Sequence, residues 1–141
     1  MSGTPHPTIE ADGWTLVSAE DRHAAHPTTF AIPAVAQRAS LTPGLAVHLL
    51  FDIETRDDGR VVDRGVDRMW VIVKACRDGR YVGVLDNDPG RAEGLRLHRG
   101  DLVWFEPRHV AAIATPPPGY VAATYGPRFF EIEPGLDGPG V

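Results

Sequence analysis

Two histidines on a short predicted helix are the first candidates for chemistry. His23 and His26 are three residues apart and follow Asp21, a spacing that can place two metal-binding side chains on one helical face. A metal site needs three or four ligands, and the sequence has no His-x-x-x-His or Cys-x-x-Cys pair to complete one. We therefore expect solvated polar groups here, with no bound metal and no cofactor.

An acidic turn, Asp86-Asn87-Asp88, followed by Pro-Gly, superficially resembles the start of a calcium loop. The sixth position of such a loop should be Gly and the twelfth a bidentate Glu, but they are Arg91 and Leu97. The sequence therefore argues against calcium binding by this motif. The residues of the turn are predicted to bond nearby backbone N–H groups, which leaves open a role in binding a partner.

Nucleophilic catalysis finds no support in the sequence. The single cysteine, Cys76, would need a neighbouring histidine and a lowered pKa, and its position near the end of a predicted strand favours a small packed residue. Gly-x-Ser-x-Gly, Gly-x-x-x-x-Gly-Lys and Gly-x-Gly-x-x-Gly are all absent. We predict no catalytic residues.

Two tryptophans are the strongest candidates for a binding surface. Trp70 precedes Val71 and Trp104 follows Val103, so both indoles point away from the core if the valines face it. Uncovered, the two rings would form a protein-binding patch, with Tyr81 as a neighbour across a hairpin. Alternatively, a helix or the proline-rich C-terminal segment covers them and makes a second small core.

Period-2 patterns predict the strands that would position these residues. In residues 45–53 a large apolar side chain recurs at every second position, from Leu45 to Ile53, which predicts a half-buried strand. Residues 69–76 and 81–86 flank Asp78-Gly79, the strongest short signal for an antiparallel hairpin. Residues 101–105 are predicted to form a further strand that ends before Pro107.

The remaining segments give weaker signals. Ser18 and Asp21 favour a short helix that ends before Pro27, and Pro33 favours one or two helical turns over 34–39. Residues 55–68 mix Arg and Asp around two glycines, which predicts a solvated loop or a frayed hairpin. Short strands are expected at 110–113 and, at an edge, 129–132.

One pattern occurs twice, 56 residues apart. Leu41, Gly44, Val47 and Leu49 share the spacing Leu-x-x-Gly-x-x-Val-x-Leu/Phe with the segment 97–105. A glycine turn that feeds a strand is frequent in small bent sheets and partly open barrels. The sequence therefore predicts an α+β fold with a small bent, mostly antiparallel sheet or partly open barrel and one or two short helices.

Length and charge limit the classes of protein. The 141 residues correspond to one domain, expected over 14–132, with flexible tails at 1–13 and 133–141. A net charge of −5 argues against nucleic acid as the main partner. The single cysteine, the absence of an export signal and the absence of an apolar stretch that could span a bilayer lead us to expect a cytoplasmic protein without membrane contact.

The chain resembles bacterial domains of unknown function in the order of four segments, which are Met69-Trp70-Val71, the hairpin, Leu85 to Pro89, and Gly100 to Phe105. Some relatives of those domains are classed as immunity proteins of polymorphic toxin systems. The resemblance covers roughly residues 14–113 and implies a compact α+β domain without established catalytic residues. The chain departs from the pattern at Gly44-Leu45, where Gly-Asp is more typical, and after Val110, where an aromatic closure is missing.

These observations favour a non-catalytic protein-binding domain, of which an immunity-type inhibitor of a toxin is the particular form that the resemblance suggests. Its partner would meet an acidic sheet face made of the following residues: Trp70, Tyr81, Asp86, Asn87, Asp88 and Trp104. One alternative is a small metal-dependent or histidine-based hydrolase that uses His23, His26, His109 and an acidic residue. Another is a small-ligand-binding regulatory domain, which would require a concave apolar pocket.

Overall fold

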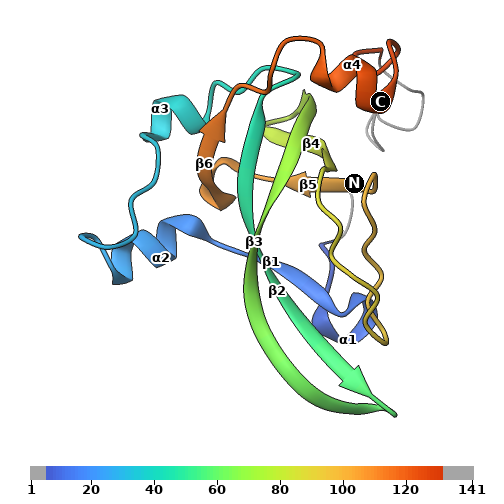
Figure 1. Cartoon of the computed structure of the whole chain (residues 1–141). Helices are drawn as coiled ribbons and strands as arrows, with labels where there is room; N and C mark the ends of the chain where they lie inside the picture. The colour runs from blue at the N-terminus through green and yellow to red at the C-terminus, as the bar shows by residue number, and fades with distance from the viewer. Residues whose placement is uncertain (1–5, 132–141) are drawn as a thin grey trace.

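Strand β2 (Ala46–Asp57) is the central element of a curled antiparallel sheet (Figure 1). One edge of β2 pairs with β3 (Arg60–Arg77), which continues into β4 (Arg80–Leu85) and β5 (Leu102–Phe105). The other edge of β2 pairs with two strands in succession, β1 (Trp14–Val17) and β6 (Val110–Ala114). The sheet thus closes partway into a half-barrel, which confirms the predicted fold class. The computed structural model describes residues 6–131.

Short helices surround the sheet (Figure 1). The α-helices are α1 (Ile9–Asp12), α2 (Ala19–Ala25), α3 (Val35–Arg38) and α4 (Tyr120–Tyr125), and a 3-10 turn, η1 (Pro107–His109), precedes β6. Helix α2 begins as predicted, because the Ser18 side chain accepts a hydrogen bond from the Asp21 backbone N–H at 3.2 Å. Two of the four helices, α1 and α4, were not expected from the sequence.

The main core lies inside the curl, and the predicted alternation of β2 is confirmed. Val47, Leu49, Phe51 and Ile53 all belong to the core, whereas the residues between them face the outer surface of the sheet. The two copies of the repeated pattern are equivalent in structure. Gly44 and Gly100 both adopt positive φ, and the strands that follow them deliver Val47 and Val103 to the same core.

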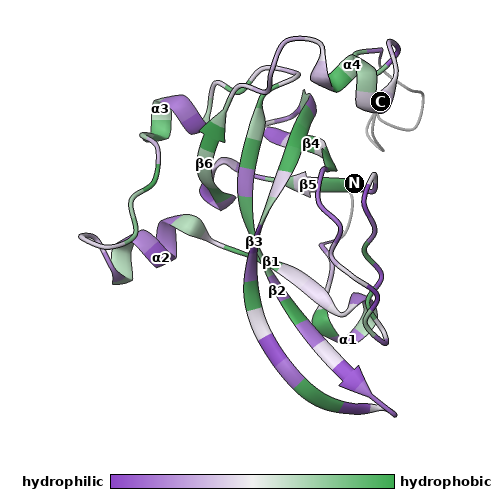
Figure 2. Cartoon of the chain, in the orientation of Figure 1, coloured by the Kyte–Doolittle hydropathy of each residue, from purple (hydrophilic) through white to green (hydrophobic). Residues whose placement is uncertain are grey.

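Both hairpins turn at Asp-Gly. Asp78 and Gly79 have φ values of 54° and 79° and join β3 to β4 in the predicted antiparallel hairpin, with Arg77 opposite Arg80. Residues 55–68, expected as a solvated loop or a frayed hairpin, form an ordered two-stranded ribbon of β2 and β3 that projects from the sheet (Figure 1). Hydrophilic and hydrophobic residues are mixed along it (Figure 2). The Glu93 carboxylate secures the tip by accepting hydrogen bonds from two backbone N–H groups of the turn at 2.9 and 2.8 Å.

A bulge in β3 reverses the faces that follow it. Val73 lies opposite Gly83, but Ala75 lies opposite Val82, so Lys74 is the extra residue. A one-residue shift moves later side chains to the other face. Tyr81 therefore points into the core, where it is 3 % exposed, rather than outward beside Trp70, and the prediction that it joins the outer patch is wrong. Cys76, expected to be packed, is exposed.

The packed part of the chain begins before residue 14, the predicted N-terminal boundary of the domain. At the C-terminal end, the structure differs from the predicted edge strand. Ile9 of α1 is buried, within the segment expected as a flexible tail. The edge strand expected over 129–132 is not formed in its described part, because residues 129–131 make a turn instead. Phe129 is buried there, with its carbonyl accepting a hydrogen bond from Lys74 Nζ; Ile132 lies outside the described residues. Within residues 6–131, no helix has both the length and the apolar character needed to cross a bilayer.

Candidate functional site

The two tryptophans lie on the outer face of the sheet, as the alternation predicts. Val71 and Val103 are fully buried in the main core, whereas Trp70 and Trp104 pack against separate small clusters on the opposite face. Both indoles are half-buried. The sequence left open whether the two rings form an uncovered patch or a covered second core. The structure combines the two, because each ring is partly covered and partly open to solvent.

Trp70 stacks on a histidine that the sequence reading did not single out. The rings of His48 and Trp70 lie 3.5 Å apart between centroids, inclined by 28°. His48 is the residue opposite Trp70 in the β2–β3 register, which places both side chains on one face. Burial, and secondarily the positive charge of Arg68, lowers the pKa of His48. The stack therefore presents a neutral, flat aromatic surface at neutral pH.

Asp86 is the polar centre of this region. Its carboxylate accepts hydrogen bonds from the hydroxyls of Tyr120, at 2.8 Å to Oδ2, and of Tyr125. Arg99 Nη2 donates to the same carboxylate at 3.2 Å. Burial raises the pKa of Tyr125 to about 12, and its hydrogen bond to Asp86 acts in the same direction. Asp86 thereby fastens both ends of α4 to the end of β4.

Asn87 and Asp88, the other two predicted residues of the turn, make local contacts. Asn87 Oδ1 accepts a hydrogen bond from the Trp70 backbone N–H at 2.5 Å, which extends the contact between the end of β4 and β3. Asp88 accepts one from the Gly90 backbone N–H at 2.9 Å. These contacts match the turn chemistry expected from the sequence.

A pocket of about 260 Å³ lies beside Trp70 and Asp86. Its floor is a row of cross-strand neighbours on β6, β2 and β3, namely Ala114, Ala46 and Ile72. Its walls are Trp70, Asp86, Tyr120 and the segment 115–117. We call this the Trp70 pocket. Two alanines in the floor leave the space, and aromatic rings and prolines border it.

Trp104 belongs to a different part of the outer face. It packs against Ala75 and Val82, and the Arg80 guanidinium lies 5.2 Å from the centre of its ring. Trp104 is absent from the lining of the Trp70 pocket. The predicted site residues therefore divide into Trp70 with Asp86 and Asn87, Trp104 on its own, Asp88 in the turn, and Tyr81 in the core.

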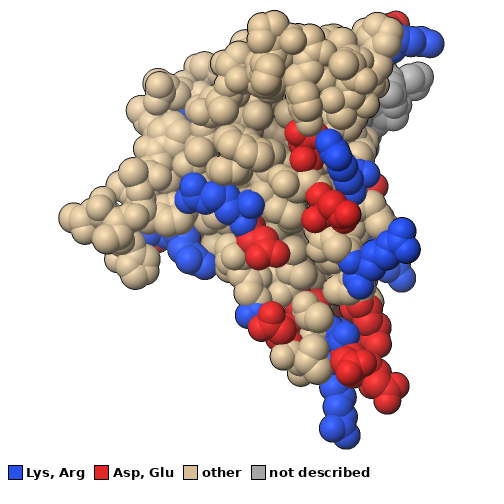
Figure 3. All heavy atoms as spheres, in the orientation of Figure 1, with Lys and Arg blue, Asp and Glu red and all other residues tan. Residues whose placement is uncertain are grey.

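Charge is distributed unevenly over the surface. Figure 3 shows acidic and basic side chains interspersed on the ribbon and its surroundings, with much of the upper part of this view uncharged. On the ribbon, Arg64 pairs with Asp52 at 3.0 Å. The view shows no purely acidic surface, and at the Trp70 pocket Arg99 accompanies Asp86. At the Trp70 pocket, the expected acidic sheet face therefore consists of one carboxylate, Asp86, among apolar and aromatic lining residues.

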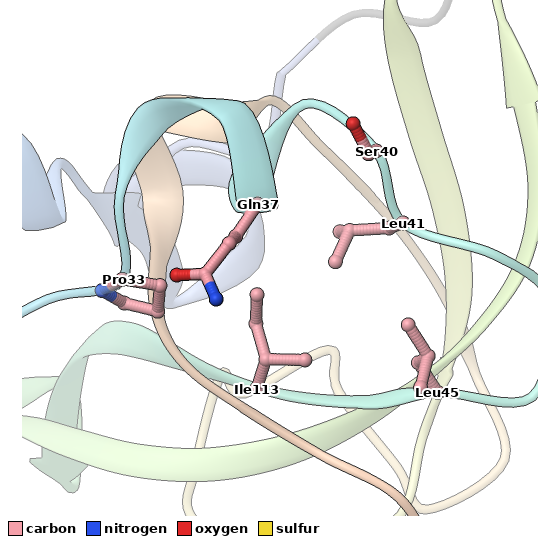
Figure 4. A pocket seen from close by; sticks show the side chains of 6 residues that line it. All are labelled: Pro33, Gln37, Ser40, Leu41, Leu45 and Ile113. Carbon is pink, nitrogen blue, oxygen red and sulfur yellow. The ribbon is translucent and has the colours of Figure 1, made fainter.

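A larger apolar groove of about 590 Å³ lies between α3 and the strands β2 and β6 (Figure 4). Leu45 and Ile113 rise from one side, Pro33 and Gln37 face them, and Leu41 closes one end. Gln37 Oε1 accepts a hydrogen bond from the Ala34 backbone N–H at 3.1 Å. The amide oxygen is thus occupied locally, and the groove is mainly apolar.

Two of the three histidines proposed for a hydrolase, His23 and His109, have backbone partners. His23 Nδ1 lies 2.7 Å from the Phe30 carbonyl, and the backbone N–H of His26 caps α2. His109 Nδ1 accepts a hydrogen bond from the Glu106 backbone N–H at 3.0 Å. Among the described residues, no three His, Cys, Asp or Glu side chains are grouped so that they could hold a metal ion. The convergence that the hydrolase alternative requires is not seen.

His109 gives this protein a testable dependence on pH. Burial, reinforced by the positive charge of Arg108, lowers the pKa of His109 from 6.5 to about 4, against the weaker opposing charges of Glu106 and Glu20. As the pH falls below 6.5, the His109 side chain is therefore protonated in the unfolded chain before it is protonated in the folded one. We expect the His109 contribution to lower the free energy of unfolding by about 2 kcal/mol between pH 7 and pH 5.

Urea denaturation at the two pH values measures this change, with His109→Asn as the reference. Asparagine keeps an acceptor at the position of Nδ1 but does not titrate, so its stability should fall by less over the same range. Equal losses in the two proteins would contradict a buried neutral His109.

Sequence reasoning missed four residues of this region: His48, Arg99, Tyr120 and Tyr125. His48 could have been found from register, since the strands of a hairpin that turns at Asp58-Gly59 bring it near Trp70. The tyrosines carry no such signal, because they are 34 and 39 residues from Asp86. Only folding brings them together.

Fold and site together define a small α+β domain with a curled antiparallel sheet and a partly open aromatic surface on its outer face. Comparison of the chain with models of known protein families, with curated proteins and with solved structures gives no significant match. The resemblance to immunity-type domains therefore remains a prediction from the sequence.

Proposed function

We propose that the chain is a non-catalytic protein-binding domain that uses the outer face around Trp70. The observation that carries this proposal is the half-exposed His48–Trp70 stack beside a pocket that contains a carboxylate. Large flat rings with polar groups nearby are typical of the centres of protein interfaces, because they lose much apolar surface to the partner and little side-chain entropy.

The particular form that we propose is an immunity-type inhibitor, which would bind and block a toxin domain. The resemblance in residues 14–113 supports this form, as do the backbone partners of His23 and His109 and the lack, among the described residues, of a group of His, Cys, Asp or Glu side chains that could hold a metal ion. An inhibitor of this kind needs a rigid surface. The hydrogen bonds of Asp86 and Asn87, which tie α4, β3 and β4 together, provide it.

Co-purification from the native host tests the proposal, together with co-expression of any toxin encoded beside its gene. The wild-type chain should retain one partner and protect cells against it. Trp70→Ala should weaken binding by about 30-fold or more, the effect expected at the centre of an interface. Circular dichroism and thermal denaturation of the variant establish that it is folded.

Phe130→Ala is the matched control. It also removes an exposed aromatic ring, but that ring lines a different groove beside Pro43 and Gly44. We expect this variant to bind the partner as the wild type does. A partner retained equally by the wild type and by folded Trp70→Ala would show that the outer face at Trp70 is not the binding surface.

The apolar groove in Figure 4 supports a second candidate, a small-ligand-binding regulatory domain. Leu41, Leu45 and Ile113 would contact an apolar ligand there. The groove has the concave apolar lining that this alternative requires.

A further inference from the structure

The Trp70 pocket has one charged side chain in its lining, Asp86, against an apolar floor and aromatic walls. The side chain of Asp86 is 11 % exposed, so the protein shields most of its charge from water. The carboxylate forms part of the pocket lining. A carboxylate in such surroundings attracts a cation more strongly than one on an open surface, because water screens it less. The chain as a whole carries −5, which adds to this preference.

The Asp86 carboxylate can accept a further hydrogen bond at Oδ2. Among the described residues, Arg99 and Tyr125 donate to Oδ1, whereas the Tyr120 hydroxyl, which has a single proton and lies 2.8 Å from Oδ2 and 3.0 Å from Oδ1, is the only donor at Oδ2. Each carboxylate oxygen accepts about two hydrogen bonds. A donor that enters the pocket can therefore bind Oδ2 without displacing a tyrosine.

Arg99 shows which donor chemistry fits this place. Its guanidinium donates to Asp86 at 3.2 Å and lies 3.4 Å from the Tyr120 hydroxyl, although the arginine side chain is 51 % exposed. The site thus already recognises a guanidinium from the solvent side. The lining of the pocket places the Trp70 indole near the Asp86 carboxylate, and guanidinium groups stack on indole rings.

We infer that the Trp70 pocket is a binding site for a guanidinium group, supplied by an arginine side chain of the protein partner. The inference rests on the proposed function for the source of the arginine and on the pocket for the chemistry. An anionic group would meet the Asp86 carboxylate, and a purely apolar group would leave Oδ2 without its additional donor. A planar cation satisfies the carboxylate and the indole together.

The experiment titrates the isotopically labelled chain with N-acetyl-arginine methylamide and follows its ¹H–¹⁵N spectrum. The matched probe is the citrulline counterpart, which has nearly the same shape but no charge. We expect saturable shifts of the Trp70 indole and of the Ala46 and Ala114 amides, with a dissociation constant on the order of 1–10 mM, and about tenfold weaker binding of citrulline.

Two variants of opposite effect sharpen the test. Asp86→Asn should weaken binding of the arginine probe about tenfold, whereas Arg99→Gln should strengthen it roughly threefold by removing the competing cation. A gain in affinity cannot come from unfolding, so Arg99→Gln keeps the test decisive even if Asp86→Asn loosens α4. Asp63→Asn on the ribbon removes the same charge outside the pocket and should leave binding unchanged.

Three results would overturn the inference: equal responses to the two probes, shifts confined to Trp104 or to the groove of Leu41 and Ile113, or an Arg99→Gln variant that binds no better. None of them would remove the proposed protein-binding role, which is tested separately by whether Trp70→Ala loses the partner. Conversely, selective binding of the arginine probe with partner retention unaffected by Trp70→Ala would support the pocket chemistry and refute the proposed interface.

Discussion

Replacing Gly83 by alanine is expected to lower the free energy of unfolding by about 3 kcal/mol, the largest effect of a single methyl group that we predict in this protein. Gly83 lies on the core face of β4, between β3 and β5. A Cβ at this position would lie 2.5 Å from Val71 Cγ1 and 2.6 Å from the Ile72 carbonyl oxygen. The second atom is backbone and cannot move aside without breaking the strand pairing.

Urea denaturation measures this loss, and a fall of roughly 10 °C in the melting temperature should accompany it. Gly65→Ala is the matched control, because Gly65 is also in the sheet but a Cβ there meets no atom within 4 Å. We expect its stability to differ from the wild type by less than about 0.5 kcal/mol. A loss below 1 kcal/mol for Gly83→Ala would mean that β3 and β4 are not as closely packed as the structure indicates.

The second large effect is expected at Asp86. Replacing it by alanine removes the acceptor of two tyrosine hydroxyls and of Arg99, and leaves the half-buried Tyr125 hydroxyl with a backbone carbonyl at 3.5 Å. Polar groups left without a partner cost about 1–3 kcal/mol, so we expect a loss of about 2 kcal/mol. The loss should be local, because these bonds join α4 to the sheet.

Amide hydrogen exchange distinguishes local release from general destabilisation. In Asp86→Ala the amides of α4 should exchange faster, whereas those of Val47 and Val71 in the main core should stay protected until global unfolding. Asp88→Ala is the control, since Asp88 bonds only the backbone of its own turn among the described residues. Unchanged exchange in α4 would show that apolar packing of Val121 alone holds the helix.

The two predictions concern opposite faces of the same strand pair. Gly83 allows β3 and β4 to pack closely on the core side, and Asp86, at the end of β4, fastens α4 on the outer side. A protein that binds through Trp70 depends on both, because Trp70 is on β3 and its pocket is completed by Tyr120 of α4. Variants at either position therefore need a folding measurement before any loss of binding is interpreted.

Local patterns were sufficient for most of the sheet. The period-2 alternation of residues 45–53 and the Asp78-Gly79 turn depend on neighbours along the chain, and the structure confirms both. The outward direction of Trp70 and Trp104 followed from the same alternation, counted from adjacent valines. The partly open barrel followed from glycine turns that each feed a strand of one core.

The bulge at Lys74 shows where such counting fails. If the bulge is ignored, the alternation places Tyr81 on the same face as Trp70. The extra residue instead places Tyr81 in the core against Phe105, with 5.4 Å between the ring centres. Nothing in the residues around Lys74 marks the bulge. Its side chain gains a partner only in the folded protein, at the Phe129 carbonyl 55 residues away.

By itself, the sequence determined the strands over residues 45–53, 69–76, 81–86 and 101–105, the Asp78-Gly79 turn and the face on which Trp70 and Trp104 lie, because these follow from contacts between near neighbours and from the alternation of side chains. The tertiary structure decided what surrounds Trp70: His48 stacked on it, α4 fastened by Asp86, and a pocket floored by alanines from two strands. Those contacts join residues far apart along the chain. Their geometry depends on register, one bulge and the path of the C-terminal segment, so no local pattern could specify them.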